Sequence, residues 1–228
     1  MKSRQIYTLG AALLIAAVAI ISVSEALRLL ALNGGDPSSA GSSVYVPTYV
    51  LSLIGTTLFV IAFPITYARQ AAAAGKTALI GLGCYIGSGL VFGYGIAAIS
   101  AIIVPFIYAN PTSRTLLTSG HGPDGFTPFV IIGALMFTIG NLCYGIGTLR
   151  ARVYPRALAF SLMVAAVLEI VGFVPVINLP VWTDLITDAA SFGPIAAMAV
   201  WLLREARINA PQLDAPIRAA VSGARMMN

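Results

Sequence analysis

Apolar residues occur along this chain in long runs that are separated by short polar segments. A helix of about 20 apolar residues crosses the hydrocarbon core of a bilayer. Runs of this length predict helices at residues 7–32, 47–67, 77–109, 128–149, 157–180 and 183–203. We therefore predict an all-α fold, a polytopic transmembrane bundle of six helices within residues 1–204, followed by a polar cytoplasmic tail at 205–228.

The first and third runs each allow two interpretations. The first follows Lys2 and Arg4 as a signal peptide would, but its apolar residues continue to Leu32, so we predict a retained helix. The third run has about 33 residues and would be roughly 50 Å long as a helix. It is either one long, tilted helix or a pair of shorter segments. The connection at 110–127 is rich in Gly, Pro, Ser and Thr and is predicted to be a loop.

The composition agrees with a membrane protein and excludes a water-soluble globule. Hydrophobic residues make up 58% of the chain and charged residues 9%, and the mean hydropathy is +0.91. A soluble domain carries about 25% charged residues. The formal net charge of +5 does not indicate nucleic acid, because the basic residues stand at the ends of the apolar runs rather than in one patch. The lipid bilayer is the predicted partner.

The positions of Lys and Arg predict the orientation of the helices. Cytoplasmic loops of membrane proteins are enriched in these residues. With six crossings and a cytoplasmic N-terminus, only Arg28 and Arg114 of the 13 basic residues lie outside. Splitting the run 77–109 into two crossings would place the arginines of 150–156 outside, so we predict a single crossing there. Both termini are then cytoplasmic, and the predicted location is the inner (cytoplasmic) membrane.

The chain offers little for metal or redox chemistry. Cys84 and Cys143 lie in separate apolar runs, and His121 is the single histidine. This excludes a disulfide framework and a His-rich metal site. The sequence contains no phosphate loop, nucleophile elbow or dinucleotide fingerprint. We predict no metal, no cofactor and no catalytic residues.

Glu169 lies near the middle of the apolar run 157–180. An ionisable group at the bilayer centre is costly unless it faces protein or water. It is therefore either a functional group, such as a proton relay, cation ligand or acid catalyst, or a protonated side chain that bonds a neighbouring helix. We regard it as the first candidate for ligand binding.

Further candidates for ligand binding lie at one end of the predicted bundle. Asp184, Asp188 and Ser191 are spaced to share one face of the helix 183–203, and they could line a polar cavity entered from outside. We interpret Asp184 as the N-terminal cap of that helix. The residues Gly193 and Pro194 are expected to weaken the same helix near the depth of Glu169.

Three more polar residues complete the candidate set. Glu25 and Arg28 are three residues apart, which suggests a self-neutralising pair on the first helix. The alternative interpretation is that Arg28 faces Asp188 and closes the mouth of the cavity. Asn141 is interpreted as a hydrogen-bond partner between helices and is included as a weaker candidate for ligand binding.

Glycines recur at spacings that allow helices to pack closely. Small residues four apart let two helix backbones approach each other in a membrane. The glycines predicted to serve helix packing are Gly83, Gly87, Gly89, Gly93, Gly133, Gly140 and Gly147.

The last third of the chain resembles a family of uncharacterised bacterial integral-membrane proteins, the domain of unknown function 4386. The resemblance covers Arg150–Arg204, about a quarter of the chain. It includes the short loop ending in Pro155 and Arg156, an apolar helix with Gly172, and a final helix that closes in the residues WLLR at 201–204. The resemblance implies a bacterial six-helix membrane protein and implies no activity.

Three hypotheses for function follow from these residues. The sequence favours a non-catalytic membrane subunit that packs against a membrane-protein partner or a second copy of the chain, because of its glycine-rich helices. The second hypothesis is a carrier or receptor for a small or lipidic molecule that uses the intramembrane carboxylates. The third is an intramembrane enzyme that uses a carboxyl group as an acid catalyst on a lipid or isoprenoid.

Overall fold

The computed structural model describes residues 3–118, 125–172 and 182–208, and all regular structure in these ranges is helical. The elements are α1 (Ser3–Ala31), η1 (Pro37–Gly41), α2 (Tyr45–Ala62), α3 (Pro64–Gly89), η2 (Leu90–Ile96), η3 (Ile99–Ile103), α4 (Val104–Ala109), α5 (Pro111–Thr118), α6 (Phe126–Ala151), α7 (Arg156–Gly172) and α8 (Trp182–Ile208).

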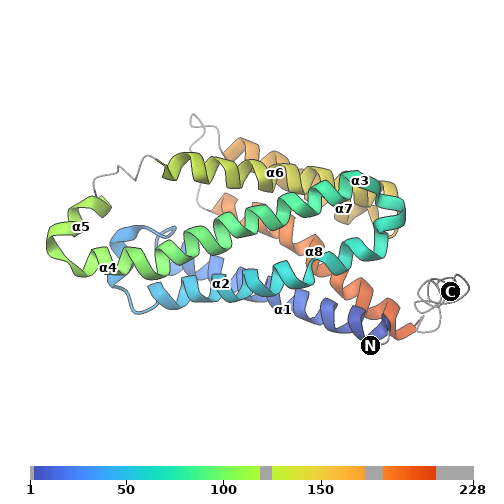
Figure 1. Ribbon diagram of the computed structural model, residues 1–228, viewed down its shortest axis with the longest axis horizontal. Helices are drawn as coiled ribbons and strands as arrows, with labels where there is room; N and C mark the ends of the chain where they lie inside the picture. Colours follow the sequence, from blue (N-terminus) through green and yellow to red (C-terminus); the bar gives the residue numbers. More distant parts are fainter. Residues whose placement is uncertain (1–2, 119–124, 173–181, 209–228) are drawn as a thin grey trace, which may run out of the picture.

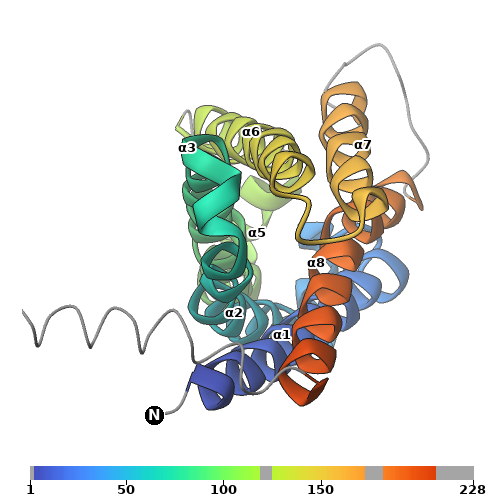
Figure 2. The same ribbon diagram turned by 90° about the vertical axis from the view of Figure 1, so that its right-hand side faces the viewer.

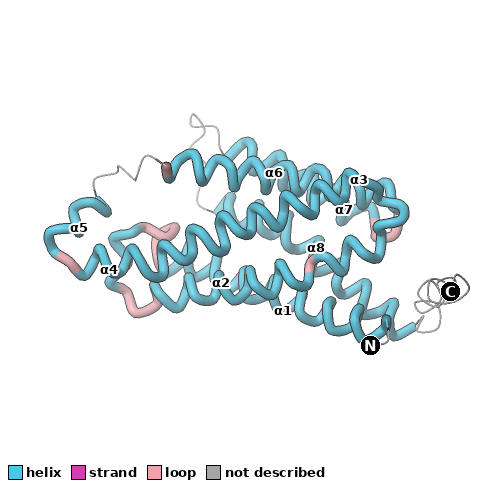
Figure 3. Tube along the Cα trace, viewed as in Figure 1, coloured by secondary structure: helices cyan, strands magenta, loops and turns pink. Residues whose placement is uncertain are grey.

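The long helices run back and forth along one axis, joined by short connections at the two ends of the bundle (Figures 1 and 3). Seen along that axis, they form a ring (Figure 2). The neighbours around the ring are α1 with α2, α3 with α6, α6 with α7, α7 with α8, and α8 with α1. The prediction of an all-helical bundle of six helices is confirmed.

Four stretches of the described chain are long and apolar enough to cross a membrane. They are Arg4–Ala31, Tyr45–Ala109, Phe126–Ala151 and Thr183–Ile208. The second stretch contains two antiparallel parts, because it folds back on itself near Gly75 (Figure 1). The predicted helix 157–180 is only partly described, since residues 173–181 lie outside the described ranges.

Gly75 makes the reversal between the second and third predicted helices. Its backbone angles, φ 66° and ψ −165°, lie outside the helical region and divide α3 into two helical parts. A side chain would strain this conformation, whereas glycine adopts it readily. Pro64 does not stop the helical conformation of the chain, although proline often ends a helix. It begins α3 directly after Phe63, whose φ of −58° and ψ of −36° are helical, so the chain continues past Ala62 with little change of direction.

The third predicted helix is one continuous helical run with two π-helical segments. The segments η2 and η3 follow α3 and lead into α4. In a π-helix, hydrogen bonds span five residues instead of four, and such segments occur frequently at functional sites. Both segments line the cavity described below.

The tightest helix packing joins α3 and α6, and glycines make it possible. A Cβ on Gly81 would lie 2.8 Å from the Cα of Tyr144, and a Cβ on Gly147 would lie 2.9 Å from the Cα of Ala78. Gly140 similarly lies against the backbone of Tyr85. Gly83 was predicted to belong to this packing, but it is exposed and a Cβ there would meet nothing within 4 Å. The helix turns by about 100° per residue, so Gly81 and Gly83 face different directions.

The remaining predicted packing glycines lie nearer the α4 end of the bundle. A Cβ on Gly87 would collide with the side chain of Met136, and one on Gly93 would collide with Thr56. Gly133 packs against Val91, while Gly89 has only ordinary contacts, the nearest at 3.6 Å.

Three predicted boundaries are wrong. The second helix was predicted to end at 67, but the first part of α3 continues to the kink at Gly75. The segment predicted as a loop from residue 110 contains the helix α5, because Pro111 starts it and the side chain of Asn110 accepts a hydrogen bond from the backbone of Thr112 at 3.1 Å. The last helix extends to Ile208, past the predicted end at 203. Arg69 binds both carboxylate oxygens of Glu205, at 3.0 and 2.5 Å, and so holds this extra turn against α3.

Pro194 does not interrupt α8, contrary to the expected weakening. A proline in a helix leaves the carbonyl four residues earlier without its N–H donor. That carbonyl belongs to Ala190, and the hydroxyl of Ser161 on α7 donates to it at 2.9 Å. A neighbouring helix thus satisfies the freed group, as is common in membranes.

Candidate ligand-binding cavity

A cavity of about 690 Å³ occupies the interior of the ring near the end of the bundle that holds α4 and η1. Each of the six predicted helices contributes to its wall, for example through Glu25, Tyr49, Ser88, Val130, Glu169 and Asp188. Cavities of roughly 300–1,000 Å³ are typical of sites for small ligands. The region around Glu169 is therefore hollow rather than a packed helix interface.

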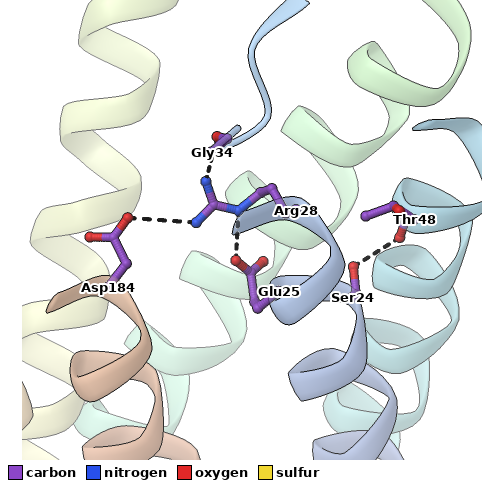
Figure 4. A network of polar contacts seen from close by, with 6 residues as sticks. All are labelled: Ser24, Glu25, Arg28, Gly34, Thr48 and Asp184. Carbon is purple, nitrogen blue, oxygen red and sulfur yellow. Dashed lines mark hydrogen bonds and ion pairs between the residues drawn. The ribbon is translucent and has the colours of Figure 1, made fainter. Parts of the chain in front are cut away.

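Arg28 is held by acceptors from three segments at the mouth of this cavity (Figure 4). Its Nε donates to Glu25 at 2.6 Å, and its Nη1 donates to the carbonyl of Gly34 at 2.8 Å. Its Nη2 lies 3.7 Å from the carboxylate of Asp184 on α8. The pair predicted within α1 is present. The ion pair across the ring is with Asp184, and Asp188 also lies near enough to Arg28 to interact with it electrostatically.

The loop after α1 is shaped to receive this arginine. Gly35 has a φ of 87°, and a Cβ there would lie 2.6 Å from the hydroxyl of Tyr49 and 3.2 Å from Cγ of Arg28. Only glycine fits both the conformation and the space. Beside it, the Asp36 carboxylate accepts the N–H of Ser38 at 2.9 Å, which lowers the pKa of that carboxyl.

Asp188 and Glu169 line the cavity without a partner of their own among the described residues. Neither carboxylate accepts a hydrogen bond or lies within an ion pair in that part of the chain, although both side chains are partly buried. The prediction that Asp184 caps the last helix is wrong, because α8 begins at Trp182 and Asp184 lies within its first turn. There it pairs with Arg28 across the ring.

Ser191 and Asn141 lie beneath the cavity rather than in its wall. Their side chains form a closed, buried set of hydrogen bonds with Tyr85. The Tyr85 hydroxyl bonds Ser191 at 2.6 Å and donates to the Asn141 carbonyl oxygen, which also accepts from Ser191 at 2.9 Å. The interpretation of Asn141 as a link between helices agrees with these contacts. Because every group in the set is paired, it forms a rigid floor that joins α3, α6 and α8.

Aromatic side chains surround this floor. Phe59, Phe137 and Phe192 each pack near Tyr85 or one another, with ring centroids 5.7–6.3 Å apart. All three also line the cavity. The lower part of the cavity is thus apolar, and the charged groups lie toward its mouth.

Two hydroxyl groups line the cavity and have no hydrogen-bond partner among the described residues. Ser88 is 3% exposed and Thr56 is 5% exposed. The two therefore offer unused hydrogen-bonding capacity to whatever occupies the cavity.

Sequence reasoning missed several residues of this site. Tyr85, Ser88 and Thr56 were not among the candidates, because single hydroxyl residues are common in membrane helices and carry no signal by themselves. The aromatic residues of the floor were indistinguishable from other apolar residues of the runs. The π-helical segments likewise had no sequence signature.

The fold and the site define a class: a helical membrane protein with an internal cavity that is charged at its mouth and aromatic at its floor. Comparison with protein-family models, with curated proteins and with solved structures finds no match to this chain. The function must therefore be argued from the site itself.

Proposed function

We propose that this protein binds a small amphipathic molecule in the cavity, as a membrane carrier or receptor. The observation that carries the proposal is an internal space of about 690 Å³. Within the described ranges, its wall includes two hydroxyls without a hydrogen-bond partner, those of Ser88 and Thr56, and two carboxylates outside any ion pair, those of Glu169 and Asp188. A bundle that served only as a packing partner would gain stability by filling such a space with apolar side chains.

Most of the glycines that favoured a packing subunit already contact other helices of the same chain. Gly87, Gly93, Gly133, Gly140 and Gly147 each lie against another helix of the same ring. They therefore explain the close packing of the bundle and no longer require a second protein. The enzyme hypothesis is a special case of this proposal, because an enzyme would also bind its substrate in this cavity.

We propose further that the chain crosses the membrane six times with both termini in the cytoplasm. The basic residues at the N-terminal end of the bundle support this orientation. Arg69 pairs with Glu205 near the end of α8 and interacts with Tyr7 near the start of α1, whereas Arg28 lies in the last turn of α1. The cavity then lies in the half of the membrane away from the cytoplasm, which in a bacterium is the outer half of the inner membrane.

Photoaffinity labelling tests the binding proposal. The probe is a ten-carbon alcohol carrying a diazirine, applied to the purified protein in nanodiscs of zwitterionic lipid. We expect saturable labelling of peptides that carry cavity residues, such as the one with Phe192. The variant Ser88→Phe, which fills the cavity, should abolish this labelling.

The matched control is Gly83→Phe, which adds the same ring to the same helix where a Cβ meets nothing within 4 Å. It should label like the original protein. If Ser88→Phe fails to fold, Thr56→Val removes one cavity hydroxyl at constant volume and should weaken labelling. Labelling that does not saturate, or that is confined to lipid-facing peptides, would contradict the proposal.

A further inference from the structure

We infer that the molecule held in this cavity is a cation, an amphipathic amine with an apolar body. This inference rests on the proposed function and names the chemical class of its ligand. It follows from the charges of the cavity wall, from which of them are already paired, and from the arrangement of apolar groups below them.

The wall of the cavity is acidic. Among the described residues that line it, four carry carboxylates and one carries a cationic group. These residues are Glu25, Glu169, Asp184, Asp188 and Arg28. An anion would meet more repulsion than attraction in such a site.

The single arginine is not free to bind an anion. Its guanidinium donates hydrogen bonds to Glu25 at 2.6 Å and to the carbonyl of Gly34 at 2.8 Å, and it forms an ion pair with Asp184 at 3.7 Å (Figure 4). Moving Arg28 to a ligand would leave Glu25 without its cation in a low-dielectric region, which is costly. Arg28 therefore balances the charge of Glu25 and Asp184 at close range and reaches Asp188 only as a longer-range charge. One guanidinium cannot neutralise four carboxylates, so the cavity wall keeps an excess of acidic groups.

Asp188 and Glu169 are the two acids of the wall that lie outside any ion pair of the described residues. They come from neighbouring helices, α8 and α7. Asp184 repels Glu169, while Asp188 is repelled by Glu25, Glu169 and Asp184 and attracted by Arg28. An ionised carboxylate within a membrane needs a partner. A ligand ammonium group between the two would supply the missing charge and several N–H donors.

The apolar part of the ligand has a matching surface. The side chains of Phe59, Phe137 and Phe192 lie toward the floor, and the hydroxyls of Ser88 and Thr56 interrupt this surface at the wall. A molecule with an amine at one end and an apolar body that carries a polar atom would satisfy the carboxylates, the rings and the hydroxyls together. A simple inorganic cation would leave most of the cavity unfilled.

Competition against the diazirine probe tests the charge of the ligand. The competitors are decylamine, decanol and decanoate, which share one chain and differ in head-group charge, in nanodiscs of zwitterionic lipid at neutral pH. We expect decylamine to displace the probe at a concentration at least tenfold lower than decanol, and decanoate to be the weakest. Equal potency of the three, or the highest potency for decanoate, would overturn the inference.

Substitutions locate the effect. The variants Asp188→Asn and Glu169→Gln should each reduce the advantage of decylamine over decanol by about tenfold or more. The control Asp36→Asn removes one acidic charge at the same end of the bundle from a residue outside the cavity wall, and it should leave the advantage intact. An advantage that persists in the double variant of Asp188 and Glu169 would overturn the assignment.

The two proposals fail in different ways. If the probe never labels cavity peptides saturably, the binding function itself is wrong. If labelling is saturable and lost in Ser88→Phe, but the competitors do not differ, the cavity binds ligands and only their cationic character is wrong.

Discussion

Polar side chains inside this bundle are held in place by hydrogen bonds to other helices. Tyr85 is the central example. Its hydroxyl bonds residues of two other helices and is fully buried. A buried hydrogen-bonding group that loses its partner costs about 1–3 kcal/mol. The floor of the cavity thus depends on one phenolic oxygen.

We predict that Tyr85→Phe destabilises the protein by about 1–3 kcal/mol, because Ser191 and Asn141 lose a shared partner while the aromatic packing stays. Thermal or denaturant unfolding of the purified protein measures this loss. The control is Tyr94→Phe, whose hydroxyl bonds Thr57 at a partly buried position and whose removal should cost less. A Tyr85→Phe variant as stable as the original would show that the set of hydrogen bonds is not required.

At the scale of the helix, a glycine allows close packing only when it lies on the face that contacts a neighbouring helix. Gly81 and Gly83 are two residues apart on α3, yet only Gly81 lies against α6. Glycine is unfavourable within a helix by about 1 kcal/mol relative to alanine. Its presence at Gly81 is explained by contact with the Tyr144 backbone, whereas Gly83 has no such explanation within this chain.

The substitution Gly81→Ala should therefore destabilise the bundle by about 1–3 kcal/mol, because the added methyl group forces α3 and α6 apart. Gly83→Ala, with open space at its Cβ, should be neutral or stabilise the protein by up to about 1 kcal/mol. Unfolding measured for the two variants in parallel provides the comparison. Equal effects of both alanines would contradict the close approach at Gly81.

At the scale of the whole molecule, the two ends of the bundle differ in charge. Arg69 and Glu205 join α3 to α8 beside Tyr7, which lies near the start of α1. The cavity is lined by Arg28 in the last turn of α1 and by Pro37 and Val104, so it lies toward the opposite end. Because the cavity lies toward one end of the bundle, the orientation of the protein in the membrane decides from which side a ligand enters.

Single cysteines test that orientation. In a background with Cys84 and Cys143 replaced by alanine, Ser38→Cys and Lys76→Cys place one exposed thiol at each end of the bundle. An impermeant maleimide applied to right-side-out vesicles should label Ser38→Cys at once and Lys76→Cys only after the membrane is opened. The reverse pattern would place the cavity on the cytoplasmic side.

The amino-acid sequence by itself determined the membrane class, the number of helices and the pairing of Glu25 with Arg28. These properties depend on local features, namely the length of apolar runs and the spacing of residues along one helix. It also singled out Glu169 and Asp188, because a carboxylate in an apolar run is conspicuous wherever it points.

Only the tertiary structure decided that those carboxylates face a hollow space, that Asp184 reaches Arg28 across the ring, and that Gly81 rather than Gly83 touches α6. It also decided that Ser161 satisfies the carbonyl freed by Pro194, so that α8 continues. The physical reason is common to all four. Each depends on the rotation and distance of one helix relative to another, and hydrophobic periodicity carries little information about rotation when a helix is apolar on every side.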